Sequence, residues 1–232
     1  MSLLSDFDTS AIAGSLGYLF LDGMQVTVTI TLVATLGGLL IGTGLAMLRL
    51  ARIPVLSKLA AVYVNTVRAL PLILVLFWFF FLMPFVMAWL TGASRPVRVG
   101  GYVSALVTFT LFEAAYFSEI MRAGIQAIPR GQVAAGQALG LGRAQVMIWV
   151  VLPQALRNMT PVILTQSIIL FQDTSLVYVL GLTDFFGAAS KIAQRDGAVV
   201  EMYLFAALVY FIICFTASML VRRLQARIAI LR

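Results

Sequence analysis

Two long stretches without a charged residue constrain the fold of this chain more than any other feature. The first extends from Gly23 to Leu48 and the second from Ala69 to Ser94. A helix needs about 20 predominantly apolar residues to cross the hydrocarbon core of a bilayer. Both stretches exceed that length, so each is predicted to form a transmembrane helix.

The composition of the whole chain agrees with insertion into a membrane. Of its 232 residues, 62% are hydrophobic and only 11% are charged, whereas soluble domains contain about 25% charged residues. The net charge of +7 does not indicate nucleic-acid binding, because the positive residues are spread between apolar stretches instead of forming one basic patch. We therefore expect an integral membrane protein.

Three further spans are expected from the remaining apolar stretches, which gives an all-α fold with five transmembrane helices. The third span covers about residues 102–125, the fourth lies in the string that runs from residue 152 to 186, and the fifth covers about residues 202–221. Residues 49–58 are predicted to be a loop, and residues 181–197 a polar external segment. In the first span, four small residues share one helical face, as is typical of close helix packing: Thr31, Thr35, Gly38 and Gly42.

The distribution of Lys and Arg predicts the orientation of the spans. One side of the membrane receives twelve of the sixteen positive residues, and the other receives Arg95, Arg98, Lys191 and Arg195. Because cytoplasmic loops carry the excess of positive residues, we expect the N-terminus outside and the C-terminus inside. The expected organisation is an external N-terminal segment at residues 1–22, one transmembrane domain at 23–221 and a basic cytoplasmic tail at 222–232.

One polar interruption, from Gly131 to Pro153, separates the third span from the fourth. It follows Pro129-Arg130, is rich in Ala, Gly and Gln, and contains the helix-ending string that begins at Gly140. The pattern predicts a short helix, closed at both ends, on the cytoplasmic side of the membrane.

This interruption resembles the cytoplasmic loop of permeases in ATP-driven (ABC) importers, in which a signature glycine is followed twelve residues later by Leu-Pro. In this chain those positions are Gly140 and Leu152-Pro153, and Ala134 stands where the family usually has Glu. The resemblance implies a type I ABC importer permease fold in which residues 129–153 form a coupling helix that sits in a groove of a separate ATPase. The coupling residues it implies are Gly131, Ala134, Ala135, Gly136, Gly140, Leu152 and Pro153.

The resemblance extends over most of the chain and is greatest to permeases of glutamate/aspartate importers. The strings that carry it are SEIMRAGIQ, LFQDTSLVYVLGLTDFF and RDGAVVEM. The Arg-x-x-Pro step at Arg68 and Pro71 resembles the Arg-Gly-Thr-Pro signature of polar amino acid permeases. The resemblance implies a location in the bacterial inner membrane with a periplasmic N-terminus. The implied partners are a second, homologous permease in a heterodimer, two copies of an ATPase and a periplasmic solute-binding protein. A permease for another polar amino acid, such as glutamine or histidine, is the alternative.

Two carboxylates lie within the third predicted span, where charge is costly and often functional. Glu119 and Arg122 share a helical face, so we expect them to form a structural pair. In the family, these two residues lie near the cytoplasmic end. No charged residue lies three or four positions from Glu113 in the sequence, and cavity lining and interhelical hydrogen bonding are both open for it.

A polar cluster follows the apolar part of the fourth span. Its members are Gln172, Asp173, Thr174 and Ser175. Polar groups at depth are accepted where they line a cavity or meet another subunit, so these residues are predicted to line the pathway or a subunit interface. The family usually has Lys at the position of Gln172.

Other classes of membrane protein fit the sequence less well. The chain has no histidine and a single cysteine, Cys214, so we expect no metal site, no cofactor and no histidine-based catalysis. Neither Lys58 nor Lys191 follows a glycine, which excludes a phosphate-binding loop and requires an external ATPase. A secondary transporter would usually contain internal repeats, and we find none that is convincing.

Overall fold

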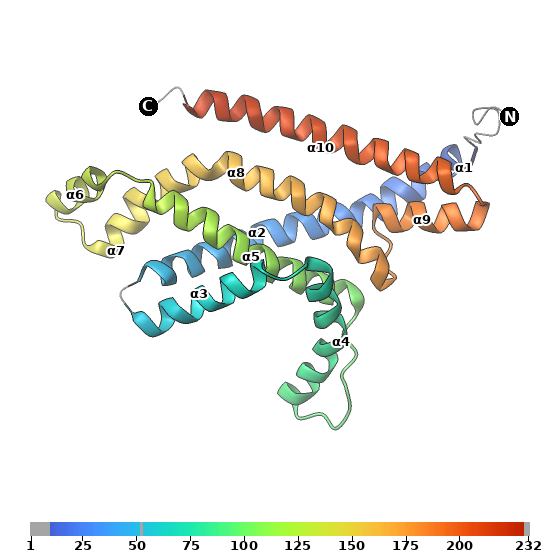
Figure 1. The fold of residues 1–232 in the computed structure, drawn as a ribbon, viewed down its shortest axis with the longest axis horizontal. Helices are drawn as coiled ribbons and strands as arrows, with labels where there is room; N and C mark the ends of the chain where they lie inside the picture. Colours follow the sequence, from blue (N-terminus) through green and yellow to red (C-terminus); the bar gives the residue numbers. More distant parts are fainter. Residues whose placement is uncertain (1–9, 52, 230–232) are drawn as a thin grey trace. The chain divides into compact units, whose positions relative to one another are not determined.

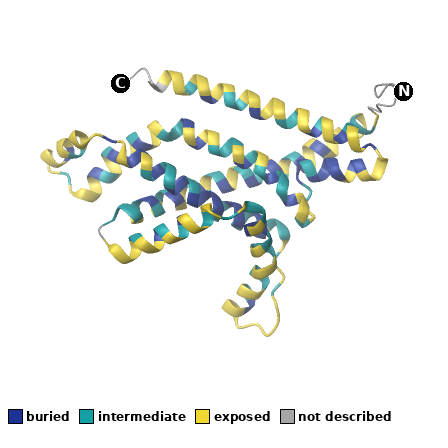
Figure 2. Cartoon of the chain, viewed as in Figure 1, coloured by how far each residue is buried: buried dark blue, intermediate teal, exposed yellow. Residues whose placement is uncertain are grey.

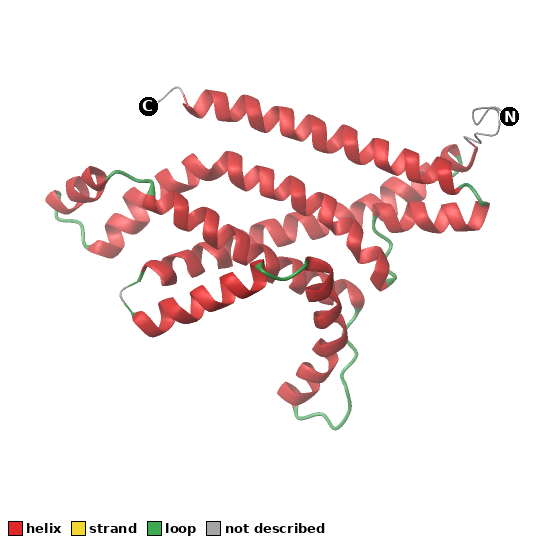
Figure 3. Cartoon of the chain, viewed as in Figure 1, coloured by secondary structure: helices red, strands yellow, loops and turns green. Residues whose placement is uncertain are grey.

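The computed structural model describes residues 10–51 and 53–229, and within these ranges every regular element is a helix (Figure 3). Among these described residues, five helical segments are long and apolar enough to span a membrane, as the sequence predicts. They are Tyr18–Leu50, Leu72–Thr91, Gly101–Gln126, Arg143–Leu180 and Val199–Arg227. Residues 1–9 of the N-terminal segment, residues 230–232 of the basic tail and Arg52 lie outside the described residues.

The helices follow one another along the chain with short connections, except for the longer loop at residues 92–100 between α4 and α5 (Figure 1). In order they are α1 Ser10–Ala13, the π-helical η1 Tyr18–Gly23, α2 Met24–Leu50, α3 Pro54–Arg68, α4 Leu72–Thr91, α5 Gly101–Gln126, α6 Arg130–Ala138, α7 Arg143–Gln145, the π-helical η2 Val146–Val151, α8 Leu152–Asp173, the 3-10 helix η3 Thr174–Leu180, α9 Phe185–Asp196 and α10 Val199–Ala229.

Two predicted spans are longer in the structure, because a charged residue ends an apolar stretch without ending a helix. The first span begins at Tyr18 and continues through Asp22, and the last extends from Val199 to Arg227. The segment predicted as a loop at residues 49–58 contains the start of α3 instead. Pro54 is the first residue of α3, where its fixed φ suits a helix and its missing N–H costs nothing.

The chain divides into two compact units. Of the described residues, the first contains 10–34, 72–109 and 168–219, and the second contains 35–51, 53–71, 110–167 and 220–229. One core of the first unit gathers apolar side chains of α2, α4, α5, α8 and η3, with Ile30, Leu76 and Phe109 fully buried.

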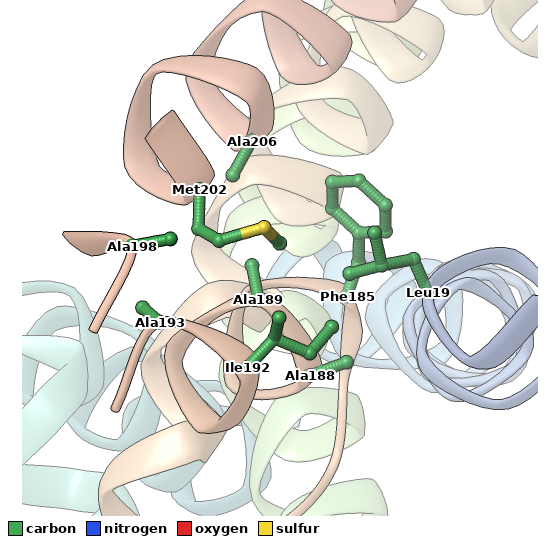
Figure 4. Close-up of a cluster of buried hydrophobic side chains, with 9 residues drawn as sticks. All are labelled: Leu19, Phe185, Ala188, Ala189, Ile192, Ala193, Ala198, Met202 and Ala206. Atoms are coloured by element: carbon green, nitrogen blue, oxygen red, sulfur yellow. The ribbon is translucent and has the colours of Figure 1, made fainter. Parts of the chain in front are cut away.

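A second core of the first unit surrounds α9 (Figure 4). Phe185, Ala189 and Ile192 pack there with Leu19 of η1 and Met202 of α10. Seven residues of α9 are buried, so the prediction that this segment is polar throughout is wrong. The chain has an amphipathic helix here, because its small and apolar residues recur at helical spacing while its charged residues lie on the other face.

The core of the second unit joins the C-terminal half of α2 to α5 and to the segment around α6 and η2. Phe117, Met121 and Val146 are buried in it. Two glycines of the predicted small-residue stripe lie against α5: a Cβ at Gly42 would lie 2.7 Å from the carbonyl oxygen of Ala114. At these positions the absence of a side chain allows the two helices to approach closely.

Candidate coupling site and polar positions

The polar interruption folds as the short helix α6, closed at its C-terminus by Gly140. The N–H of Gly140 donates to the carbonyl of Gln137 at 2.9 Å, and that of Leu141 donates to the carbonyl of Gly136 at 3.1 Å. This pair of bonds is a Schellman motif, which requires a left-handed residue just past the helix end. Gly140 has a φ of 84°, so glycine is favoured there.

One side of α6 is held by the segment that follows it. Gly136 is buried, and a Cβ placed on it would lie 3.0 Å from Cγ2 of Val146 in η2. Val133 and Leu141 pack against the same core. The side-chain amide of Gln154, in α8, donates to Oε1 of Gln132 in α6 at 3.4 Å. These contacts fix α6 on η2 and on the start of α8.

The start of α8 also contains the Leu-Pro pair of the predicted coupling segment. The π-helical turn η2 precedes Leu152, whose N–H donates to the carbonyl of Met147. Pro153 follows inside α8 and is exposed. Because proline has no N–H to donate, it is compatible with an irregular turn at this point.

The opposite side of α6 is exposed (Figure 2). Gly131, Ala134 and Ala135 belong to this surface. Leu139 lies beside them with 84% of its surface exposed. Sequence reasoning did not select Leu139, although a large apolar residue next to the terminal glycine of a polar helix is a usable signal. A small-residue surface with one protruding leucine suits contact with another protein.

Glu119 of α5 lies among three arginines. The guanidinium of Arg122 bonds to it along the same helix, which is the predicted pair. Nη1 of Arg49, on α2, lies 2.6 Å from Oε2 of Glu119, and Nη1 of Arg68, on α3, lies 3.9 Å from the same oxygen. The sequence did not predict these two arginines as partners, because they come from other helices.

Glu113 has an interhelical hydrogen bond. Its side chain is 1% exposed, and Oε1 accepts a hydrogen bond at 3.2 Å from Nε2 of Gln166 on α8. A Cβ at Gly38 of α2 would lie 2.9 Å from Cβ of Glu113. Glu113 therefore links α5 to α8 at a position where α2 also approaches closely.

The fourth-span cluster extends across the change from α8 to η3. Gln172 and Ser175 line a cavity of about 260 Å³ together with the aromatic residues Phe186, Tyr203 and Tyr210. Thr174 is fully buried and its hydroxyl donates to the carbonyl of Phe171 at 2.8 Å, while Asp173 precedes the 3-10 helix. The four residues are adjacent in sequence but do not share one environment.

Asp184 caps the N-terminus of α9, between the fourth and fifth candidate spans of the structure. Its carboxylate accepts hydrogen bonds from the N–H groups of Phe186 at 3.1 Å and Gly187 at 3.0 Å. Burial raises the pKa of Asp184 to about 6, and these backbone bonds oppose the rise. In the described part of the chain, no group of three His, Cys, Asp or Glu residues could hold a metal ion.

Comparison with known proteins identifies relatives over almost the whole length. Residues 34–230 match the family described as binding-protein-dependent transport system inner membrane component. The chain is 51% identical over 224 residues to the glutamate/aspartate import permease protein GltK of Escherichia coli O157:H7, covering 97% of this chain and 99% of that protein. It is 36% identical over 209 residues to the probable glutamine ABC transporter permease protein GlnP of Bacillus subtilis strain 168, covering 89% and 92%.

Solved structures give the same result for the fold. A chain from the crystal structure of an amino acid ABC transporter with histidines matches with a TM-score of 0.79 and 27% identity, covering 98% of this chain and 100% of that chain. A chain of the inward-facing MetNI methionine ABC transporter matches with a TM-score of 0.66 and 20% identity, covering 89% and 96%. The prediction of an ABC importer permease fold is confirmed.

Proposed function

Since this chain belongs to the family of binding-protein-dependent transport system inner membrane components, we propose that it is the permease subunit of an importer for glutamate and aspartate. Membership in the family makes the chain a transport component of the inner membrane and implies an ATPase and a binding protein as partners. The substrate assignment rests on one observation: the 51% identity to a glutamate/aspartate import permease over nearly the full length of both proteins.

Glutamine is the second candidate substrate. The probable glutamine permease of Bacillus subtilis is 36% identical to this chain, and glutamine differs from glutamate only in an uncharged side-chain amide. We favour acidic substrates because identity is considerably higher to the glutamate/aspartate permease. The pairing of this chain with a different, homologous permease is part of the same proposal, as is the orientation with a periplasmic N-terminus.

In this proposal α6 transmits movement between the ATPase and the membrane helices. Its exposed surface, which includes Ala134, Ala135 and Leu139, contacts the ATPase. Its other side packs through Gly136 against η2, and η2 leads directly into α8. A displacement of the ATPase surface is therefore passed to α8 through packed side chains instead of being absorbed by a mobile loop. The Glu usually found at Ala134 is not required for this packing.

Uptake of labelled amino acids tests the substrate assignment. Cells that lack this chain should not accumulate labelled glutamate through this importer, and the reintroduced chain should restore uptake. Unlabelled aspartate should compete and unlabelled glutamine should compete weakly. The Gly140→Asp variant serves as an inserted but uncoupled control. Restored uptake of glutamine without uptake of glutamate would replace the proposed substrate by the second candidate.

A further inference from the structure

The three arginines around Glu119 carry more positive charge than that carboxylate neutralises. Arg49, Arg68 and Arg122 contribute three positive charges and Glu119 one negative charge, and Glu119 is the only carboxylate that forms an ion pair with any of them within the described residues. The local excess is therefore two positive charges. Like charges held this close repel each other unless another anion or water compensates them.

The position of the cluster makes this excess costly. Glu119 lies seven residues before the end of α5, which places it about 10 Å inside that end at 1.5 Å per residue. The side chains of Glu119 and Arg49 are 26% and 13% exposed, so bulk water reaches them only in part. Charge interactions are stronger in such surroundings than in open solvent.

Arg68 is the member of the cluster with unused binding capacity. It approaches Glu119 no closer than 3.9 Å, a distance for an ion pair but not for a hydrogen bond, and its side chain is 38% exposed. The aromatic ring of Tyr116 lies beneath its guanidinium, 5.5 Å from the ring centre. Stacking on a ring orients a guanidinium while leaving its N–H groups free to bind an anion.

Arg49 contributes a second guanidinium group next to Oε2 of Glu119. One nitrogen of its guanidinium bonds to Oε2 of Glu119 at 2.6 Å, and a guanidinium has five N–H donors in all. Arg122 uses its remaining donors differently, because its Nη1 bonds to Gln126 at 2.7 Å. The available donors are therefore those of Arg68 and Arg49, which both face Oε2.

We propose that Arg68 and Arg49, next to Glu119, form a binding site for one oxyanion, a carboxylate or a phosphate. Planar guanidinium groups bind both kinds of anion through paired hydrogen bonds. Two sources offer this chemistry: the carboxylate of an acidic amino acid in transit, and the phosphate of an anionic lipid head group. The first source rests on the proposed function, whereas the second is independent of it.

The test uses the purified complex with its ATPase, without the binding protein, in phosphatidylcholine nanodiscs. The measurement is the midpoint of thermal unfolding during titration with sodium L-glutamate, with sodium chloride as the ionic-strength control. A second series of nanodiscs contains increasing fractions of phosphatidylglycerol and no glutamate. Arg68→Gln removes the proposed anion ligand, Arg68→Lys keeps its charge, and Arg223→Gln removes an exposed arginine of α10 that is not in the cluster.

We expect glutamate or phosphatidylglycerol to raise the midpoint of thermal unfolding. Arg68→Gln should lower the apparent affinity for that anion at least about tenfold. Arg68→Lys should keep part of it, and Arg223→Gln all of it. Loss of the glutamate effect alone identifies the transported acid as the ligand, and loss of the lipid effect alone identifies the head group. Stabilisation that is absent, or unchanged in Arg68→Gln, overturns the proposal. The uptake experiment tests the substrate assignment separately. The lipid measurement contains no amino acid, so its result does not depend on that assignment.

Discussion

The N–H of Leu141 donates to the carbonyl of Gly136 at 3.1 Å across the end of α6, and Gly140 lies between them with a positive φ. This bond connects the buried side of α6 to the residue that re-enters the core, since Gly136 and Leu141 both pack near Val146. The residues between them are exposed. One tight turn therefore presents Leu139 and Gly140 on the surface while anchoring the helix that carries them.

Replacement of Gly140 with Asp should abolish transport while all five spans still insert, because the residue lies in an exposed turn outside the spans. No atom lies within 4 Å of a Cβ at this position, so the local cost comes from the positive φ alone and should be about 1 kcal/mol. The added carboxylate should weaken ATPase association, measured as the ratio of bound ATPase to permease in the purified complex.

The matched control for this change is Gly140→Asn. Asparagine tolerates the left-handed conformation and carries no charge, so it should retain more transport than either Asp or Ala. If Asp lowers expression but the surviving complexes contain normal amounts of ATPase with normally stimulated hydrolysis, Gly140 acts only as a turn former.

Replacement of Leu139 with Ala should weaken ATPase binding without lowering the stability of the permease. Leu139 is 84% exposed, so its truncation leaves no cavity in this chain, whereas loss of an apolar anchor from an interface costs about 1–2 kcal/mol. Leu141→Ala is the matched control at the same helix end. Because Leu141 packs in the core of the second unit, its truncation should lower the thermal midpoint of the permease itself. Equal effects of both changes on ATPase binding would argue against Leu139 as an anchor.

Gly42→Ala should destabilise the permease, whereas Gly44→Ala on the same helix should not. A Cβ at Gly42 would lie 2.7 Å from the carbonyl oxygen of Ala114 and 2.8 Å from the N atom of Ser118, both of which are backbone atoms of α5. Forcing these helices apart should cost about 1–3 kcal/mol. No atom lies within 4 Å of a Cβ at Gly44, and alanine is the better helix former there. Thermal unfolding in detergent, followed for both variants, gives the comparison.

Replacement of Glu119 with Gln should reduce assembly of the complex, because three guanidinium groups then remain without their shared carboxylate. The expected loss is about 1.5–3 kcal/mol for a hydrogen bond to a charged group. Adding Arg122→Gln should recover part of this loss, because it removes one of the stranded charges. Strictly additive effects in this double-mutant cycle would indicate that the two residues act independently.

A cysteine at Ser175 should react with water-soluble thiol reagents faster than a cysteine at Thr174, in a Cys214→Ala background. Ser175 lines the 260 Å³ cavity with Gln172, while Thr174 is fully buried and its hydroxyl donates to the carbonyl of Phe171 in α8. The expectation that the whole cluster faces the pathway or the partner permease is therefore restricted to the two members that line the cavity, Gln172 and Ser175. Equal labelling of both cysteines in folded protein would contradict the structural difference between them.

Apolar length and charge spacing along the sequence determined the class of this protein and its five spans. The reason is that hydrocarbon excludes charge and unsatisfied backbone groups, so the need to span the bilayer is visible in a linear sequence. Local signals also determined α6 and its end, because Gly140 and the residues that form the Schellman bonds are neighbours in the chain. The pair of Glu119 and Arg122 was predictable for the same reason, since both residues lie on one helix.

The tertiary structure alone decided which groups from different helices meet. Arg49 and Arg68 reach Glu119 from α2 and α3, and Gln166 reaches Glu113 from α8. No spacing rule along one helix predicts such contacts, because they depend on how helices cross. The sequence did not reveal burial either: Thr174 and Ser175 are adjacent and both polar, yet Thr174 is fully buried while Ser175 lines a cavity. The sequence thus determined what crosses the membrane, and helix packing decided which polar groups are paired and which are accessible.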